Sequence, residues 1–214
     1  MKNIAVVFGG FSSEHEVSVK SGKFIYENLK DNQSLNVYQI CISKESNYVI
    51  YDNNKYDLDY MNLSFNINGE KINLDGIFNI IHGEPGENGD LANILEKNNI
   101  PQTGCNSFVS DLTFDKKRYI DFVNKLDIPS SKHILLTSEN QFDLEKIMSE
   151  INIPCIVKPN NGGSSIGVSK VNHIYDLENK IKIAFKECNE VLIEDFLFGR
   201  EVSVGVIQKK DERI

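Results

Sequence analysis

The order of apolar runs constrains the fold of this 214-residue chain more than any other feature. In the first half, strand-like runs lie at residues 4–8, 35–42 and 76–81, and helical apolar spacing lies at residues 14–30 and 90–99. The first run, IAVVF, ends at Gly9-Gly10, as a buried strand does. Because strands that alternate with helices form parallel sheets, we expect a parallel, doubly wound α/β domain over residues 1–105.

The second half has a different order of elements. Its strand-like runs lie at residues 132–136, 153–158, 168–171, 190–195 and 201–207, and its helical patterns lie at 114–126, 140–150 and 175–188. Several of these strands follow one another through short loops, which indicates antiparallel hairpins rather than crossover helices. We therefore expect a second, α+β unit over residues 106–200, with the boundary near TGCNS (103–107).

Composition excludes several classes of partner. The chain is 40% hydrophobic and 25% charged, which fits one large or two small globular domains. Its net charge of −8 argues against a nucleic-acid or anionic-membrane partner. No apolar run approaches membrane-spanning length, and the N-terminal run is too short for a signal-peptide core. The cysteines, which lie in or beside apolar runs without a C-x-x-C pair, are expected to be buried, reduced thiols of a cytoplasmic protein: Cys41, Cys105, Cys155 and Cys188.

The glycine-rich stretch KPNNGGSSIGVSKV (158–171) nearly matches a phosphate-binding Walker A loop, with Gly162 and Gly167 at the right spacing. A Walker A loop continues with Lys and Ser or Thr at the start of a helix. Here Val168 and Ser169 occupy those positions, and the chain continues with strand-like alternation. The stretch is therefore predicted to be a flexible loop between two strands.

Such a loop offers many hydrogen-bond donors and little bulk. The donors are Lys158 at the base of the loop, the backbone of Gly162 and Gly163, and the hydroxyls of Ser164 and Ser165. Donors without bulk suit a phosphate group. A plain glycine-rich hairpin explains the same residues equally well.

The turn after the first strand, GGFSSEHEVS (9–18), lies where open α/β sheets bind ligands. It lacks the G-x-G-x-x-G pattern of a dinucleotide site. Glu14 at the start of the next helix has two readings: it interacts favourably with the helix dipole, or it binds a ligand ammonium. Together with nearby backbone N–H groups that favour an anion, the second reading predicts a zwitterion such as an amino acid.

Two further clusters follow strand ends. In HGEPGENG (82–89), His82 and two glutamates lie in a tight loop, where a lone histidine is also common as a structural hydrogen-bonding residue; no second His or Cys lies at zinc-ligand spacing. The segment VLIEDFLFGRE (191–201) has two readings. It could bind an adenine amino group and ribose hydroxyls through Glu194, Leu197 and Glu201, or these could be solvated turn residues.

In this order the four segments resemble the D-alanine–D-alanine ligase family of ATP-grasp ligases, along the whole chain. The matching segments are residues 6–22, 82–89, 157–171 and 191–201, the second with Asn88 where the family signature has Asp. The resemblance implies that residues 1–105 are the N-terminal substrate domain, that 106–200 are the ATP-grasp lid, and that 201–214 begin a C-terminal subdomain. The chain is accordingly expected to be the N-terminal two-thirds of an enzyme.

The resemblance also implies roles for individual residues. Lys116 and Lys158 would contact ATP phosphates together with the loop residues Gly162, Gly163, Ser164 and Ser165. Glu194, the backbone of Leu197, and Glu201 would contact adenine and ribose. Glu14 and His82 would bind the first D-alanine, and Ser164 would help to lock the loop across the site.

The implied reaction joins two D-alanines through an acyl phosphate, with ATP converted to ADP, for peptidoglycan precursor synthesis. Magnesium or manganese is expected in the full-length enzyme, which is expected to be a homodimer, but the family's metal ligands are expected to lie outside these 214 residues. The chain alone is therefore expected to be inactive. Two alternatives stay open: a ligase for D-lactate or D-serine as the second substrate, and a non-catalytic nucleotide-binding module.

Overall fold

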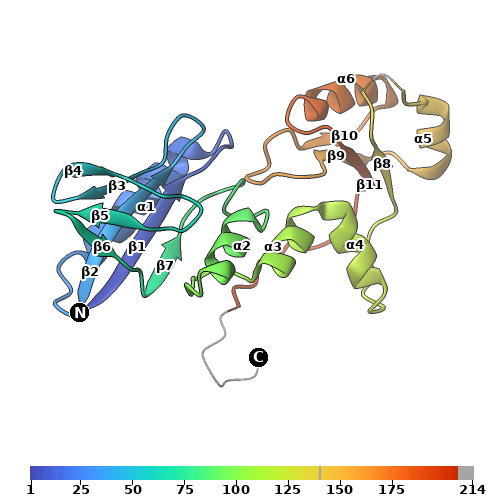
Figure 1. Cartoon of the computed structure of the whole chain (residues 1–214). Helices are drawn as coiled ribbons and strands as arrows, with labels where there is room; N and C mark the ends of the chain where they lie inside the picture. The colour runs from blue at the N-terminus through green and yellow to red at the C-terminus, as the bar shows by residue number, and fades with distance from the viewer. Residues whose placement is uncertain (140, 207–214) are drawn as a thin grey trace.

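The computed structural model describes residues 1–139 and 141–206 and contains two larger sheets, one in each half of the chain (Figure 1). The first sheet has the strand order β4-β3-β2-β1-β7, in which the strands are Asn54–Asp57, Tyr48–Tyr51, Leu35–Ile42, Lys2–Gly9 and Gly76–Asn79. Strand β1 lies between β2 and the edge strand β7 and pairs in parallel with both. The predicted parallel sheet is thus confirmed for β2, β1 and β7.

The outer strands β3 and β4 are antiparallel, which the expectation of a purely parallel sheet did not include. They are joined by Asp52-Asn53, both at positive φ (47° and 61°), the backbone of a two-residue hairpin turn. A second hairpin, β5 (Phe65–Ile67) and β6 (Glu70–Ile72), turns at Asn68-Gly69 in the same way. Two residues leave no room for a crossover helix, so these strands must run antiparallel.

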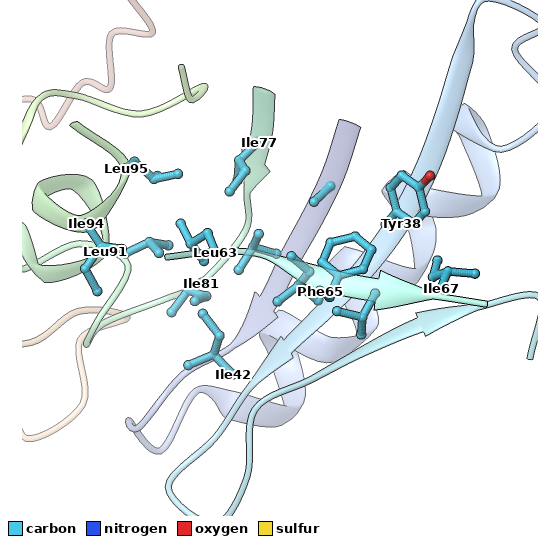
Figure 2. Close-up of a cluster of buried hydrophobic side chains, with 14 residues drawn as sticks. Tyr38, Ile42, Leu63, Phe65, Ile67, Ile77, Ile81, Leu91, Ile94 and Leu95 are labelled. Atoms are coloured by element: carbon cyan, nitrogen blue, oxygen red, sulfur yellow. The ribbon is translucent and has the colours of Figure 1, made fainter. Parts of the chain in front are cut away.

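Both faces of the first sheet are covered by apolar residues. On β1, Val6 and Phe8 face helix α1 (His15–Leu29), whereas Ala5 and Val7 belong to the cluster on the opposite face. That second cluster, shown in Figure 2, brings Phe65 and Ile67 of β5 together with Leu91, Ile94 and Leu95 of helix α2 (Asp90–Lys97). Because both faces are buried, polar groups are confined to strand ends and loops.

The second sheet has the order β10-β9-β11-β8, in which the strands are Ser169–Val171, Cys155–Pro159, Val191–Asp195 and His133–Leu136. All neighbours are antiparallel, as predicted for an α+β unit. Helices α5 (Leu144–Glu150) and α6 (Ile174–Phe185) pack on one face of this sheet. We refer to this sheet with its helices as the lid. Helices α3 (Ser107–Phe114) and α4 (Lys116–Asn124) connect it to the first half (Figure 1).

Two local predictions, the strand at 201–207 and the burial of Cys105, were wrong. Residues 201–206 are exposed and form no strand, since no described neighbour pairs with them; Ile207 lies outside the described residues. The helix predicted at 114–126 is found as α4, and the apolar residues Tyr119, Phe122 and Leu126 of that stretch are exposed. Cys105 is exposed because it lies in the connection between the halves, whereas Cys41 and Cys155 are buried and free. Within the described residues, no helix has the length and apolarity that a membrane crossing requires.

Candidate functional site

The glycine-rich segment at residues 161–168 is a loop between the antiparallel strands β9 and β10. No helix begins at its end, so the exclusion of a Walker A loop is confirmed. Ser164 and Ser165 adopt left-handed backbone angles (φ 45° and 58°) and form the turn of the loop. The loop residues from Gly162 to Ile166 are exposed, so their donors are accessible from outside the fold.

Lys158 and Glu194 lie on adjacent strands at the base of this loop. In the β9–β11 register, Lys158 is opposite Leu192 and Glu194 is opposite Ile156, which places both charged side chains on one face of the sheet. Lys158 Nζ lies 2.5 Å from Glu194 Oε2, and the two side chains are only 20% and 11% exposed. The other face of the same sheet is the apolar face that packs on α6. The predicted phosphate and adenine contacts therefore share one face of the lid.

Lys116 reaches the same loop from the first turn of α4. Its ammonium group donates to the carbonyl oxygens of Gly162, at 2.9 Å, and of Asn160, at 3.2 Å. Burial, followed by the positive charge of Lys158, lowers the pKa of Lys116. Two ammonium groups close enough to oppose each other's charge favour an anion between them.

Glu14 precedes helix α1 directly, yet its side chain does not cap the helix. The carboxylate is buried, with 5% of the residue exposed, and Glu14 Oε1 accepts a hydrogen bond from Ser164 Oγ of the glycine-rich loop. A Cβ at Gly163 would lie 3.3 Å from Glu14 Oε2, so the loop backbone approaches the carboxylate closely. The structure thus brings Glu14 and Ser164 together, across 150 residues of sequence.

The loop that contains His82 is tied to the turn after β1. Ser12 Oγ donates to the carbonyl of His82 at 2.8 Å, and the Phe11 N–H donates to the carbonyl of Glu84 at 2.7 Å. Glu87 closes the loop by accepting from the Gly83 N–H at 2.7 Å. His82 joins this arrangement through its backbone carbonyl, so its predicted contact with the substrate stays a prediction.

The glycine-rich loop separates two cavities. The larger one, about 700 Å³, lies between the two halves. It is lined by Glu14 with its neighbours Phe11, Ser12 and Ser13, by Lys44, Gly83 and Glu84, by Phe114 of α3, and by the lid residues Pro159, Asn161–Gly163, Ile166 and Phe185–Glu190. The smaller one, about 240 Å³, is lined by Lys116, Glu87, Thr113, Phe114, Gly162 and Gly163. Lys158 and Glu194 line neither cavity. Glu14 and Lys116 therefore face separate hollows that share Gly162 and Gly163.

Two predicted residues are not brought to the site. Leu197 and Glu201 are exposed and lie in the segment after β11 that has no regular secondary structure. Their proposed contacts with adenine and ribose stay predictions, as do the roles of the other residues.

Comparison with known proteins adds an independent line of evidence. Residues 3–105 match the family model described as D-ala D-ala ligase N-terminus, and residues 122–214 match the model described as D-ala D-ala ligase C-terminus. The chain belongs to the D-alanine–D-alanine ligase family. The curated D-alanine–D-alanine ligase of Flavobacterium johnsoniae is 40% identical over 213 residues, which are 99% of this chain and 66% of that protein. The Flavobacterium psychrophilum ligase is 40% identical over 98% of this chain and 64% of its own length. The chain thus spans about two-thirds of the length of these relatives.

Solved structures agree with this assignment to the D-alanine–D-alanine ligase family. The D-alanine–D-alanine ligase from Helicobacter pylori superposes with a TM-score of 0.77 at 30% identity, covering 93% of this chain and 65% of that one. The VanG D-Ala:D-Ser ligase from Enterococcus faecalis superposes with a TM-score of 0.78 at 28% identity, covering 92% and 63%. The predicted ATP-grasp fold is therefore confirmed.

Sequence reasoning missed one residue that organises the site of this family member. Asn160 is fully buried and hydrogen-bonds to Asp115, Lys116, Lys117 and Glu190. Its only sequence signal is an amide directly after a strand, a position where asparagine is common in turns. That signal is too weak to reveal contacts across 45 residues.

A magnesium site is not formed by the part of the chain that the structure describes. Within residues 1–139 and 141–206, no three His, Cys, Asp or Glu side chains are grouped so that they could hold a metal ion. The donor set present here does not fit the metal that the family implies.

Proposed function

We propose that the protein is an ATP-dependent D-alanine–D-alanine ligase that makes the dipeptide for peptidoglycan precursors. Family membership supports this function. In the site itself, the strongest support is one hydrogen bond. The hydrogen bond from Ser164 to Glu14 joins the glycine-rich loop of the lid to the first half, and Lys116 contacts the same loop at the Gly162 carbonyl. A loop anchored in this way can cover two substrates at once.

The residues of the chain support a division of labour between the two halves. Lys116 and Lys158 would hold the phosphates of ATP, because cationic groups stabilise the charge on a transferring phosphoryl group. Glu14 would bind the ammonium of the first D-alanine. The carboxylate of that first D-alanine is a poor electrophile, and it would be activated by accepting the phosphoryl group of ATP. The amine of the second D-alanine would then attack the acyl phosphate and displace phosphate. Closure of the loop through Ser164 would keep water from the acyl phosphate.

The family implies a divalent metal bound with ATP, magnesium or manganese, which would neutralise phosphate charge. Among residues 1–139 and 141–206, no three His, Cys, Asp or Glu side chains are grouped to hold it. A cytoplasmic location and a homodimer are also proposed, the first supported by the free, buried thiols of Cys41 and Cys155.

A second candidate is a ligase that joins D-alanine to D-serine. The similarity to the VanG D-Ala:D-Ser ligase, at 28% identity, favours keeping it. The residues described here bind the first substrate in either case, so they do not discriminate between the candidates.

The test is a substrate panel with the full-length natural protein, ATP and magnesium. Phosphate release and product mass are measured with D-alanine alone and with D-alanine plus D-serine or D-lactate. We expect the D-alanyl-D-alanine mass and D-alanine-dependent phosphate release. A mixed product in preference to the dipeptide would establish the second candidate or its D-lactate counterpart. ATP binding without phosphate release would indicate a nucleotide-binding module.

A further inference from the structure

Every polar atom of Asn160, the residue that directly follows strand β9, forms a hydrogen bond to α4, to its capping residue or to Glu190. Its backbone N–H donates to the carbonyl of Glu190 at 2.9 Å, and its carbonyl accepts from the backbone N–H and the ammonium of Lys116, at 3.1 and 3.2 Å. In the side chain, Oδ1 accepts from the Lys117 N–H at 2.9 Å, and Nδ2 donates to Asp115 Oδ1 at 3.0 Å and to Glu190 Oε2 at 2.8 Å. The residue is 0% exposed.

These bonds attach the start of helix α4 to the end of β9. The first N–H groups of a helix have no partner within the helix. In α4, Asn160 accepts from the first two, those of Lys116 and Lys117, while Asp115 caps the Arg118 N–H. Only an amide side chain both accepts from Lys117 and donates to the carboxylates of Asp115 and Glu190. A carboxylate at this position would oppose those two carboxylates. An apolar residue would remove the partner of the Lys117 N–H and of the Glu190 carboxylate, whereas Asp115 would still accept from the Arg118 N–H.

The attachment determines where Lys116 lies relative to Lys158. Lys158 is placed by strand β9, on which it lies two residues before Asn160. Lys116 lies on a separate element, and its ammonium group contacts the same Asn160 carbonyl that holds its backbone. Without the side-chain bonds of Asn160, the start of α4 would keep only the bonds of Lys116 to the carbonyls of Asn160 and Gly162, so the spacing of the two ammonium groups would be held less firmly.

We propose that Asn160 is a positioning residue: it docks helix α4 onto β9 so that Lys116 and Lys158 converge on one phosphate group. This inference rests on the proposed ATP-dependent function. It assigns to Asn160 an effect on nucleotide binding that acts through Lys116, and no direct contact with ATP.

The test is a double-mutant cycle on ATP affinity, measured by calorimetry with the full-length natural protein. The variants are Asn160→Ala, Lys116→Ala and the double variant. We expect Asn160→Ala to weaken ATP binding roughly tenfold, a coupling typical of residues in one hydrogen-bond network. In the Lys116→Ala background, the same substitution should have little further effect. The Michaelis constant for ATP should rise with that of D-alanine unchanged.

Two controls separate positioning from loss of stability. Ile181→Ala removes a fully buried side chain from the lid core, away from Asn160, and should lower the melting temperature without changing ATP affinity. If Asn160→Ala does not fold, Asn160→Ser replaces it in the cycle, since a hydroxyl adds no charge beside the two carboxylates and its single donor loses at least one of the two donated bonds. Thermal denaturation shows which variants are folded at the assay temperature.

The outcomes distinguish the two proposals. If Asn160→Ala weakens ATP binding by the same factor in the natural protein and in the Lys116→Ala variant, the inference is overturned and the proposed function is not. Asn160 would then not act through Lys116. Absence of ATP binding by the unaltered protein would overturn the proposed function, and the inference with it.

Discussion

The two large sheets of this protein differ in what covers their faces: both faces of the first sheet are apolar and buried, whereas one face of the lid sheet carries charged side chains. In the first sheet, consecutive residues Val6 and Val7 of β1 are both fully buried, one in each of the two apolar clusters. In the lid sheet, only the α6 side is an apolar cluster, and the other side carries the ion pair of Lys158 and Glu194. The first sheet can therefore present chemistry only at its strand ends, as at Glu14, whereas the lid presents it on a sheet face.

This difference predicts which substitutions change binding and which change stability. Charged groups on a partly buried face are costly unless they are paired, so the lid holds Lys158 and Glu194 together until a ligand competes for them. In the first half both faces of the sheet are packed, so this half contributes to the site through the loops at the ends of β1 and β7. The following experiments test that division.

The largest effect is expected for Lys158→Ala, which removes a charged contact from the lid face. A charge-assisted hydrogen bond in a desolvated site contributes roughly 1.5–3 kcal/mol, so ATP binding should weaken about tenfold to 150-fold. Lys146→Ala, an exposed lysine on α5, should change ATP affinity by less than about twofold. Equal effects of the two substitutions in a calorimetric titration would remove the lid face from the nucleotide site.

Neighbouring substitutions on one strand test the packing of the faces. Val6→Ala and Val7→Ala should each lower the free energy of unfolding, by about 1.5–3 kcal/mol, since each removes two buried methyl groups and leaves a cavity. On β10, Val171→Ala should have a similar effect, because Val171 is buried in the lid core.

The matched position on the other face of β10 is Lys170. It is exposed, and its ammonium group lies 3.4 Å from the ring centre of Phe196. Lys170→Ala should therefore cost only about 0.5–1 kcal/mol. Chemical denaturation measures all four variants. A loss at Lys170 as large as that at Val171 would show that both faces of the lid sheet are packed alike.

Glu14→Gln tests the contribution of the first half. The substitution keeps the acceptor for Ser164 and removes the negative charge, so it should raise the Michaelis constant for the first D-alanine roughly five- to tenfold, about 1–1.5 kcal/mol. The constant for ATP should stay the same. Glu16→Gln is the matched control, because Glu16 is an exposed acid in the first turn of the same helix. If Glu14 matters only for the helix dipole, both substitutions should lower stability by about 0.3–1 kcal/mol and leave the kinetics unchanged.

The smallest effect is expected at the turns. Gly69 in the β5–β6 hairpin has φ 85°, and a Cβ there would meet no atom within 4 Å. Gly69→Ala should thus cost only the backbone strain, about 1 kcal/mol of stability, with ATP affinity unchanged. Gly162 in the lid loop also has positive φ and open space, yet its carbonyl contacts Lys116. Gly162→Ala should weaken ATP binding by a few fold. Identical behaviour of the two variants in melting and titration experiments would contradict a functional role of the loop glycine.

Much of the fold follows from local sequence patterns. The run IAVVF with Gly9-Gly10, and the alternation around residues 153–171, predict β1 and the β9–β10 pair because burial pattern and strand period are local properties. The Asn68-Gly69 dipeptide is also a strong local hairpin signal, and it predicts the turn between β5 and β6. Residues 201–206 show the opposite case, since alternation alone does not make a strand without a neighbour to pair with.

The site was less accessible to sequence reasoning. Lys158 could be predicted because it lies within the glycine-rich motif. Its pairing with Glu194 depends on the register of β9 against β11, and the Ser164–Glu14 bond depends on how the two halves meet. The bonds of Asn160 join residues up to 45 positions apart. Such contacts come from tertiary structure, and no local pattern encodes them.

The most direct test of the division between the sheets is hydrogen–deuterium exchange of the full-length protein with and without a non-hydrolysable ATP analogue. A ligand protects backbone amides that it contacts or whose local opening it suppresses. We predict protection at residues 161–168 and along β9 and β11, with exchange in β2, β3 and β4 unchanged. Protection confined to residues 9–14, the turn after β1, with none in the lid loop, would place the nucleotide on the first sheet and contradict the account.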